Sequence, residues 1–99
     1  MSKDASAPIR VGVVGFGLAG AVFHAPLIAS TPGMELRSVV TSDPERQARA
    51  RKEYPEADVL AELDDLWSAA SEHDLVVVGT PNRFHVPIAF RALEAGLHV

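Results

Sequence analysis

The sequence predicts an α/β fold with a doubly wound parallel sheet, and three observations lead to this prediction. Short apolar runs alternate with helical patterns along the chain, and parallel strands need such helices as crossover connections. A glycine-rich turn follows the first apolar run, and a later run ends in Gly79-Thr80-Pro81. Such loops belong at the carboxyl edge of an open sheet. Right-handed crossovers then predict the strand order 3-2-1-4-5, with the fifth strand truncated at its start.

The strands are predicted from compact apolar runs that turn residues separate. The predicted strands are residues 9–14, 35–41, 57–60 and 75–78, with 97–99 as the beginning of a fifth. Residues 75–78 are all apolar, Leu-Val-Val-Val. We therefore expect the fourth strand to be fully buried.

Four helices are predicted between the strands, over residues 18–30, 44–54, 63–71 and 86–95. Pro26 should kink the first helix or start a new turn, because proline has no N–H for an interior position. Asp43 is expected to cap the second helix, with Pro44 at its first position. Asp64 is expected to cap the third, and Gly96 to end the fourth.

Composition narrows the possible functions. The 99 residues suffice for one small domain, and the formal charge of −4 does not suit a nucleic-acid binder. No apolar run reaches the roughly 20 residues that span a bilayer. The chain has no cysteine, and its four histidines lack metal-ligand spacing, so we expect no metal site. Residues 1–8 look like a flexible leader rather than a signal peptide. The absence of cysteine fits a cytoplasmic location.

The glycine turn has the pattern Gly-x-Gly-x-x-Gly at Gly15, Gly17 and Gly20. It follows a predicted strand and opens a predicted helix, which is the setting of the Rossmann dinucleotide fingerprint. Gly15 would allow the tight turn, Gly17 the approach of a pyrophosphate, and Gly20 close helix packing. The N–H groups of residues 16–19 would point at the anion. The alternative is a turn that serves packing alone.

The end of the second strand favours NADP over NAD. An NAD site usually has a carboxylate about 20 residues beyond the glycines, and Thr41 or Ser42 occupies that position. Their hydroxyls can donate to a 2′-phosphate, and Arg46 could add positive charge one turn into the next helix. Asp43 keeps the alternative open, because it would favour NAD if it turned towards the ribose instead of capping the helix.

The loop after the fourth strand is the second candidate part of the site, because ligands of open α/β sheets bind at the carboxyl ends of the strands. Thr80 and Asn82 offer hydrogen bonds, and Pro81 stiffens the turn. His85 begins the next helix and is interpreted either as a local cap or as a ligand contact. Arg83 is expected to face solvent.

Two runs of the sequence resemble the glucose-fructose oxidoreductase / inositol dehydrogenase / MocA-type family. They are GFGLAGAVFHAPLI at 15–28 and GTPNRFHVPIAFRALEAGLHV at 79–99. The first run is most similar to the NADP-dependent scyllo-inositol dehydrogenase branch. The resemblance implies an oxidoreductase that transfers a hydride between NADP, or alternatively NAD, and a sugar or polyol. It also implies a C-terminal substrate domain, absent from this chain, and a homo-oligomeric parent.

The resemblance also implies which residues meet the cofactor. Gly15, Phe16, Gly17, Leu18 and Ala19 would hold the pyrophosphate, with Gly20 completing the turn. Thr41, Ser42 and Arg46 would meet the adenosine ribose or its phosphate, and Thr80, Pro81, Asn82 and His85 would line the nicotinamide side. The family's catalytic lysine lies in a Glu-Lys-Pro motif that this sequence does not contain. No catalytic residue is assigned, His24 and His98 included, and the fragment alone is expected to be inactive.

Two other functions fit parts of the pattern. A non-enzymatic nucleotide-binding or redox-sensing module would share the glycine turn, but it should bind its nucleotide tightly without a second domain. A methyltransferase-like domain that binds S-adenosylmethionine is disfavoured by Gly20 and by the Thr-Pro-Asn loop at residues 80–82.

Overall fold

The computed structural model describes residues 7–17 and 19–99. Most of the predicted leader, residues 1–6, and Leu18 of the glycine turn lie outside the described residues. Parallel strands form a sheet in the order β3-β2-β1-β4. Their bounds are β1 (Ile9–Val14), β2 (Met34–Val40), β3 (Asp58–Leu60) and β4 (Leu75–Val78). The Rossmann-type α/β fold is thereby confirmed. A parallel bridge joins His98 to Leu75, on the side of β4 where the fifth strand was predicted.

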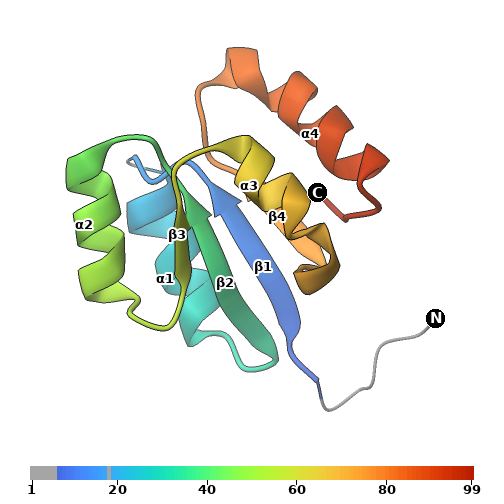
Figure 1. The fold of residues 1–99 in the computed structure, drawn as a ribbon. Helices are drawn as coiled ribbons and strands as arrows, with labels where there is room; N and C mark the ends of the chain where they lie inside the picture. Colours follow the sequence, from blue (N-terminus) through green and yellow to red (C-terminus); the bar gives the residue numbers. More distant parts are fainter. Residues whose placement is uncertain (1–6, 18) are drawn as a thin grey trace.

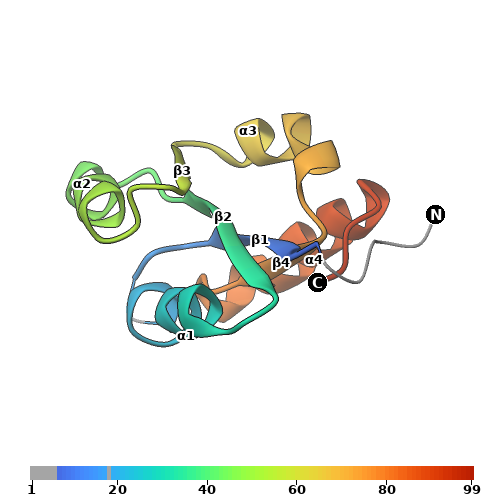
Figure 2. The ribbon, with the colours of Figure 1, turned by 90° about the horizontal axis from the view of Figure 1, so that it is seen from below.

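The helices lie on both faces of this sheet, and α1 and α3 are on opposite sides of it (Figure 2). The α-helices are α1 (Ala25–Ser30), α2 (Pro44–Glu53), α3 (Leu63–Ser68) and α4 (His85–Glu94). The described residues also form the π-helical η1 (Ala19–His24) and the 3₁₀ turns η2 (Ala70–Glu72) and η3 (Asn82–Phe84). Among the residues described, no helix is both long and apolar enough to cross a membrane.

The first crossover helix has two parts. It is π-helical from Ala19 to His24 and α-helical from Ala25 onward, with Pro26 in the first turn of α1. A proline is accepted at that position because the first N–H groups of a helix have no partner within it. The prediction that Pro26 starts a new turn is confirmed, whereas nothing in the sequence signalled the π-helical segment.

Two of the local predictions are wrong. Asp64 does not cap the third helix: Glu62 is the residue before it and makes no capping hydrogen bond through its side chain, and Asp64 lies in the first turn. There its charge still suits the helix dipole. The fourth strand is only partly buried, with Val76 alone fully enclosed. Its outer side has a single bridge as a neighbour, which leaves Leu75, Val77 and Val78 partly exposed.

Each face of the sheet has its own apolar core. The core on the side of η1, α1 and α2 is formed by Val11, Val13, Phe16, Ala21, Ala25, Ile28, Leu36, Val39 and Ala50. The core on the side of α3 and α4 is formed by Val14, Val40, Leu66, Val76, Ile88, Ala92 and Leu97. Alternate residues of β1 therefore enter opposite cores, as expected for a strand covered on both faces.

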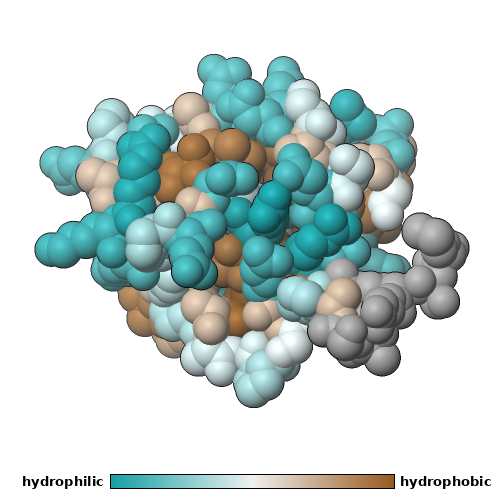
Figure 3. All heavy atoms as spheres, turned by 60° about the horizontal axis from the view of Figure 1, so that its bottom comes forward, coloured by the Kyte–Doolittle hydropathy of each residue, from teal (hydrophilic) through white to brown (hydrophobic). Residues whose placement is uncertain are grey.

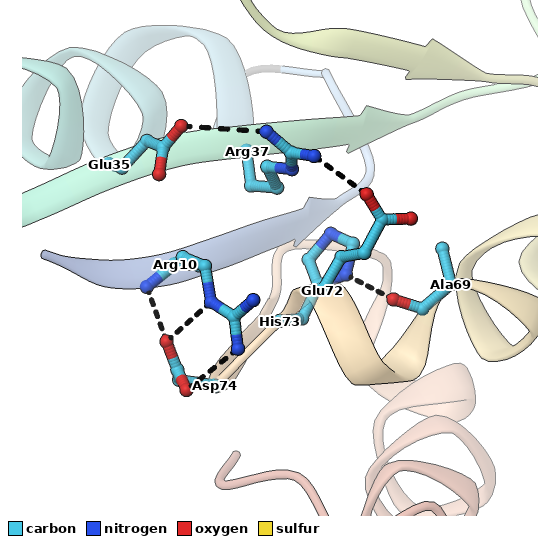
Figure 4. A network of polar contacts seen from close by, with 7 residues as sticks. All are labelled: Arg10, Glu35, Arg37, Ala69, Glu72, His73 and Asp74. Atoms are coloured by element: carbon cyan, nitrogen blue, oxygen red, sulfur yellow. Dashed lines mark hydrogen bonds and ion pairs between the residues drawn. The ribbon is translucent and has the colours of Figure 1, made fainter. Parts of the chain in front are cut away.

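A polar network joins β1 and β2 to the segment that leads into β4 (Figure 4). Arg10 forms a two-pronged ion pair with Asp74, at 3.1 and 3.3 Å. Arg37 pairs with Glu72 at 2.7 Å. The two ion pairs lie away from the glycine turn and attach the segment before β4 to β1 and β2. Seen from the side on which the strands begin, the surface is mostly hydrophilic (Figure 3).

The same network includes a buried histidine. His73 is 5% exposed and its Nε2 lies 2.7 Å from the hydroxyl of Ser38, which is fully buried. Its Nδ1 lies 2.8 Å from the carbonyl oxygen of Ala69, so Nδ1 donates and Nε2 accepts from Ser38. Both ring nitrogens are thus satisfied, and His73 has a structural role.

Candidate cofactor site

The glycine turn lies where the carboxyl ends of the strands meet, towards the top of Figure 1. Gly15 has a φ of +93°, a left-handed conformation that side chains rarely adopt. Its N–H donates to the carbonyl of Val40 (2.8 Å). A Cβ on Gly15 would lie 3.1 Å from the carbonyl oxygen of Gly79. Gly15 therefore brings the ends of β1, β2 and β4 close together.

The other two glycines of the fingerprint have different surroundings. A Cβ on Gly20 would lie 2.0 Å from the carbonyl oxygen of Gly15, so this position admits no side chain. The three nearest atoms to a Cβ on Gly17, adjacent residues aside, are guanidinium atoms of Arg46, at 3.6 to 3.8 Å, which is ordinary contact. Gly20 thus allows the helix to pack closely on the turn, whereas Gly17 faces an exposed cationic side chain.

Phe16 can serve a ligand only through its backbone. Its ring is 1% exposed and meets the ring of Tyr54 edge-on at 6.2 Å, while the guanidinium of Arg49 lies 5.8 Å from it. Burial raises the pKa of the Tyr54 phenol. The ring of Phe16 therefore anchors the turn against α2. Leu18, and the side chain of Ala19, lie outside the described residues.

The residues after β2 are held by the first turn of α2. Oδ1 of Asp43 accepts from the N–H of Glu45 at 2.9 Å, which confirms the predicted cap. Thr41 is buried, and its carbonyl accepts from the side-chain amide of Gln47 at 2.8 Å. Ser42 is exposed. Sequence reasoning missed Gln47. Its place one turn into α2, within reach of the end of β2, is the signal that could have identified it.

The loop after β4 is fixed by His85. Its Nε2 donates to the carbonyl oxygen of Thr80 at 2.5 Å, so this histidine holds its own loop. The hydroxyl oxygen of Thr80 is buried and has no hydrogen-bond partner among the described residues. A buried hydroxyl without a partner is costly, which makes Thr80 a candidate ligand contact. The side chain of Asn82 lies outside what the structure describes.

Two cavities meet at the glycine turn, of about 360 and about 350 Å³. Gly15, Arg46 and Thr80 border both of them. The first is also lined by Val14, Phe16, Val40, Thr41, Ser42, Ala61, Leu63, Phe84 and Ile88, and the second by Gly17, Gly79 and Pro81. Of the residues predicted for the site, leaving aside Leu18, Ala19 and Asn82, His85 and Gly20 line neither. Gly79 is an addition, whose signal was its place at the end of β4.

The charged side chain that lines this site is a cation. Arg46 is the cation on its border, and no carboxylate of the described residues lines either cavity. No group of three potential metal ligands occurs among the residues described. Bare backbone at the start of a helix, a cation and hydroxyls together suit a phosphate-bearing ligand.

Comparison with known proteins agrees with this geometry. Residues 9–99 match the model of a family described as oxidoreductases with an NAD-binding Rossmann fold. The oxidoreductase YdgJ of Escherichia coli is 45% identical over 91 residues, which is 92% of this chain and 25% of that protein. The scyllo-inositol 2-dehydrogenase (NADP(+)) IolW of Bacillus subtilis is 33% identical over 91 residues, 92% of this chain and 24% of that protein.

A solved structure shows the same fold. The scyllo-inositol dehydrogenase of Lactobacillus casei, with bound NAD(H) and scyllo-inositol, superposes with a TM-score of 0.84 and 31% identity. The match covers 93% of this chain and 27% of that one. The chain thus spans about a quarter of the length of the relatives it matches.

Proposed function

The chain belongs to the oxidoreductase family with an NAD-binding Rossmann fold, and from that premise we propose that it forms the cofactor site of an NADP-dependent sugar or polyol dehydrogenase. One observation carries the proposal: two adjoining cavities share the glycine turn, a cation and a hydroxyl. The backbone of residues 15–17 would hold the diphosphate, and Thr80 and Pro81 would lie on the nicotinamide side.

The preference for NADP is supported by what surrounds Ser42. The carboxylate that would repel a 2′-phosphate is missing there, because Asp43 is turned to the N–H of Glu45 as a cap. Ser42 is exposed and, with Thr41, lines the cavity of about 360 Å³. Hydroxyls and the positive end of α2 favour a phosphate at this point.

The substrate class is proposed from the relatives, two of which are named for scyllo-inositol. A nicotinamide cofactor exchanges a hydride with a carbinol carbon of such a polyol. The proposal assigns cofactor binding to residues 9–99 and assigns neither substrate binding nor proton transfer to them. The side chains at the site are the cation and hydroxyls described above, which suit holding a phosphate rather than moving a proton at neutral pH.

Fluorescence titration of the full-length protein with NADPH and NADH tests the proposal, because reduced nicotinamide emission changes on binding. We expect both to bind and NADPH to bind more tightly. Equal or tighter binding of NADH would overturn the choice of cofactor. If neither binds, the assignment of the cavities to a dinucleotide fails as well.

A further inference from the structure

We propose that Arg46 binds the diphosphate that NAD and NADP share, so that it adds affinity for any adenine dinucleotide instead of selecting the 2′-phosphate. The inference rests on the proposed nucleotide site and goes beyond it. It differs from the expectation drawn from the sequence, which placed Arg46 at the ribose phosphate.

The position of the guanidinium is the first support. Its Nη1, Cζ and Nη2 atoms are the atoms nearest to a Cβ built on Gly17, at 3.6, 3.7 and 3.8 Å. Gly17 is the residue whose missing side chain lets a diphosphate approach the backbone. The guanidinium therefore lies over the diphosphate cradle.

The cavities give the second support. Arg46 borders both, including the one of about 350 Å³ that Gly17, Gly79 and Pro81 help to line. Thr41 and Ser42 border only the other. The cation thus stands where the two cavities join, and Thr80 also borders both. A diphosphate at this junction would offer acceptors to the guanidinium.

The guanidinium is also held weakly enough to change partner. Its ion pair is with Asp43 at 3.8 Å, and the two side chains are 54% and 45% exposed. Pairs so exposed contribute little, whereas arginine binds phosphate oxygens in a two-pronged geometry. Asp43 keeps its hydrogen bond to the N–H of Glu45 when Arg46 moves, so binding would leave α2 capped.

Four nucleotides separate the two roles of Arg46. NADPH carries both groups, NADH and ADP carry the diphosphate alone, and adenosine 2′-monophosphate carries the 2′-phosphate alone. In Arg46→Ala we expect affinity for NADPH, NADH and ADP to fall by a similar factor of about ten, with the affinity for the 2′-monophosphate little changed. Calorimetric titration measures all four.

Arg51→Ala is the matched control, since Arg51 is an exposed arginine in the last turn of the same helix and lines neither cavity. It should leave all four affinities unchanged. A loss confined to NADPH and adenosine 2′-monophosphate would overturn the inference while leaving the nucleotide site standing. If the unsubstituted protein binds none of the four, the proposed function falls and the inference with it.

Discussion

The glycines of the turn differ in what an added methyl group would contact, and this difference separates structural positions from binding positions. Gly17→Ala adds a methyl group whose three nearest atoms, adjacent residues aside, belong to the guanidinium of Arg46, at no less than 3.6 Å. We therefore expect the free energy of unfolding to change by less than about 0.5 kcal/mol. The same methyl group would stand in the path of the diphosphate, so NADPH affinity should fall by more than about tenfold. Urea denaturation measures the free energy of unfolding, and NADPH titration of the same preparation measures the affinity.

Gly20→Ala is the counterpart of that substitution. Its methyl group would lie 2.0 Å from the carbonyl oxygen of Gly15, which is backbone and cannot move aside cheaply. Overpacking of this kind costs about 1–3 kcal/mol or more, so the loss should appear first as a lower urea midpoint. If Gly17→Ala instead proved the more destabilising of the two, the division of roles would be wrong.

Ser42 gives the prediction on cofactor choice. Ser42→Asp places a carboxylate at the exposed end of β2, where it would repel a 2′-phosphate and accept from ribose hydroxyls. NADPH affinity should fall by about tenfold or more, with NADH affinity unchanged or higher. Ser42→Asn has the same shape without the charge and should retain the preference for NADPH. A parallel loss for both cofactors would show that Ser42 does not select between them.

The glycines of the site were predictable from the local sequence, whereas the contacts of Arg46 and His85 were not. The three glycines were predictable because their Gly-x-Gly-x-x-Gly spacing lies within six residues of sequence. The direction of Arg46 could not be predicted, since it depends on how α2 sits beside the glycine turn. The role of His85 depended in the same way on the path of its own loop, which only the fold defines.

At the scale of the element, α2 is the helix whose start matters most to the site. Asp43→Ala removes the acceptor for the N–H of Glu45, and loss of such a cap costs about 1 kcal/mol. We expect that loss in urea denaturation, with NADH affinity retained. A clear fall in NADH affinity would mean that Asp43 binds the ribose, which was the open alternative.

Asp43→Asn is the control for that experiment, because asparagine caps helices about as well as aspartate. It should keep most of the stability. The cap of α2 was predictable because Ser-Asp-Pro-Glu at residues 42–45 carries all its signals in sequence. Asp64 misled because the residue before α3 is Glu62, two residues earlier, which places Asp64 in the first turn.

At the scale of the whole molecule, the sheet order was predictable and the distribution of exposed apolar surface was not. Alternating strands and helices with right-handed crossovers lead to β3-β2-β1-β4. On α4, however, only Ile88 and Ala92 are buried, while Val86, Phe90 and Leu93 are 78%, 63% and 62% exposed. Apolar periodicity in sequence identifies the helix but not which of its two apolar sides meets the sheet.

One pH-dependent contribution to stability comes from the ion pair between Arg37 and Glu72, in the network that joins β1 and β2 to the segment before β4 (Figure 4). The hydrogen bond from Arg37 holds the pKa of Glu72 below its usual value. A carboxylate whose pKa is lower in the folded state stabilises the protein above its unfolded pKa of about 4.3. That contribution is lost as the pH falls through the folded pKa. Glu72→Gln removes the charge, so the variant should be less stable than the unsubstituted protein at pH 7. The two stabilities should converge as the pH falls through the acid range, as followed by urea denaturation.

Glu94→Gln, at an exposed glutamate that ends α4 outside the network, should show no such convergence. A stability difference between the Glu72 variant and the unsubstituted protein that stayed constant with pH would mean that Arg37 does not stabilise the ionised form of Glu72.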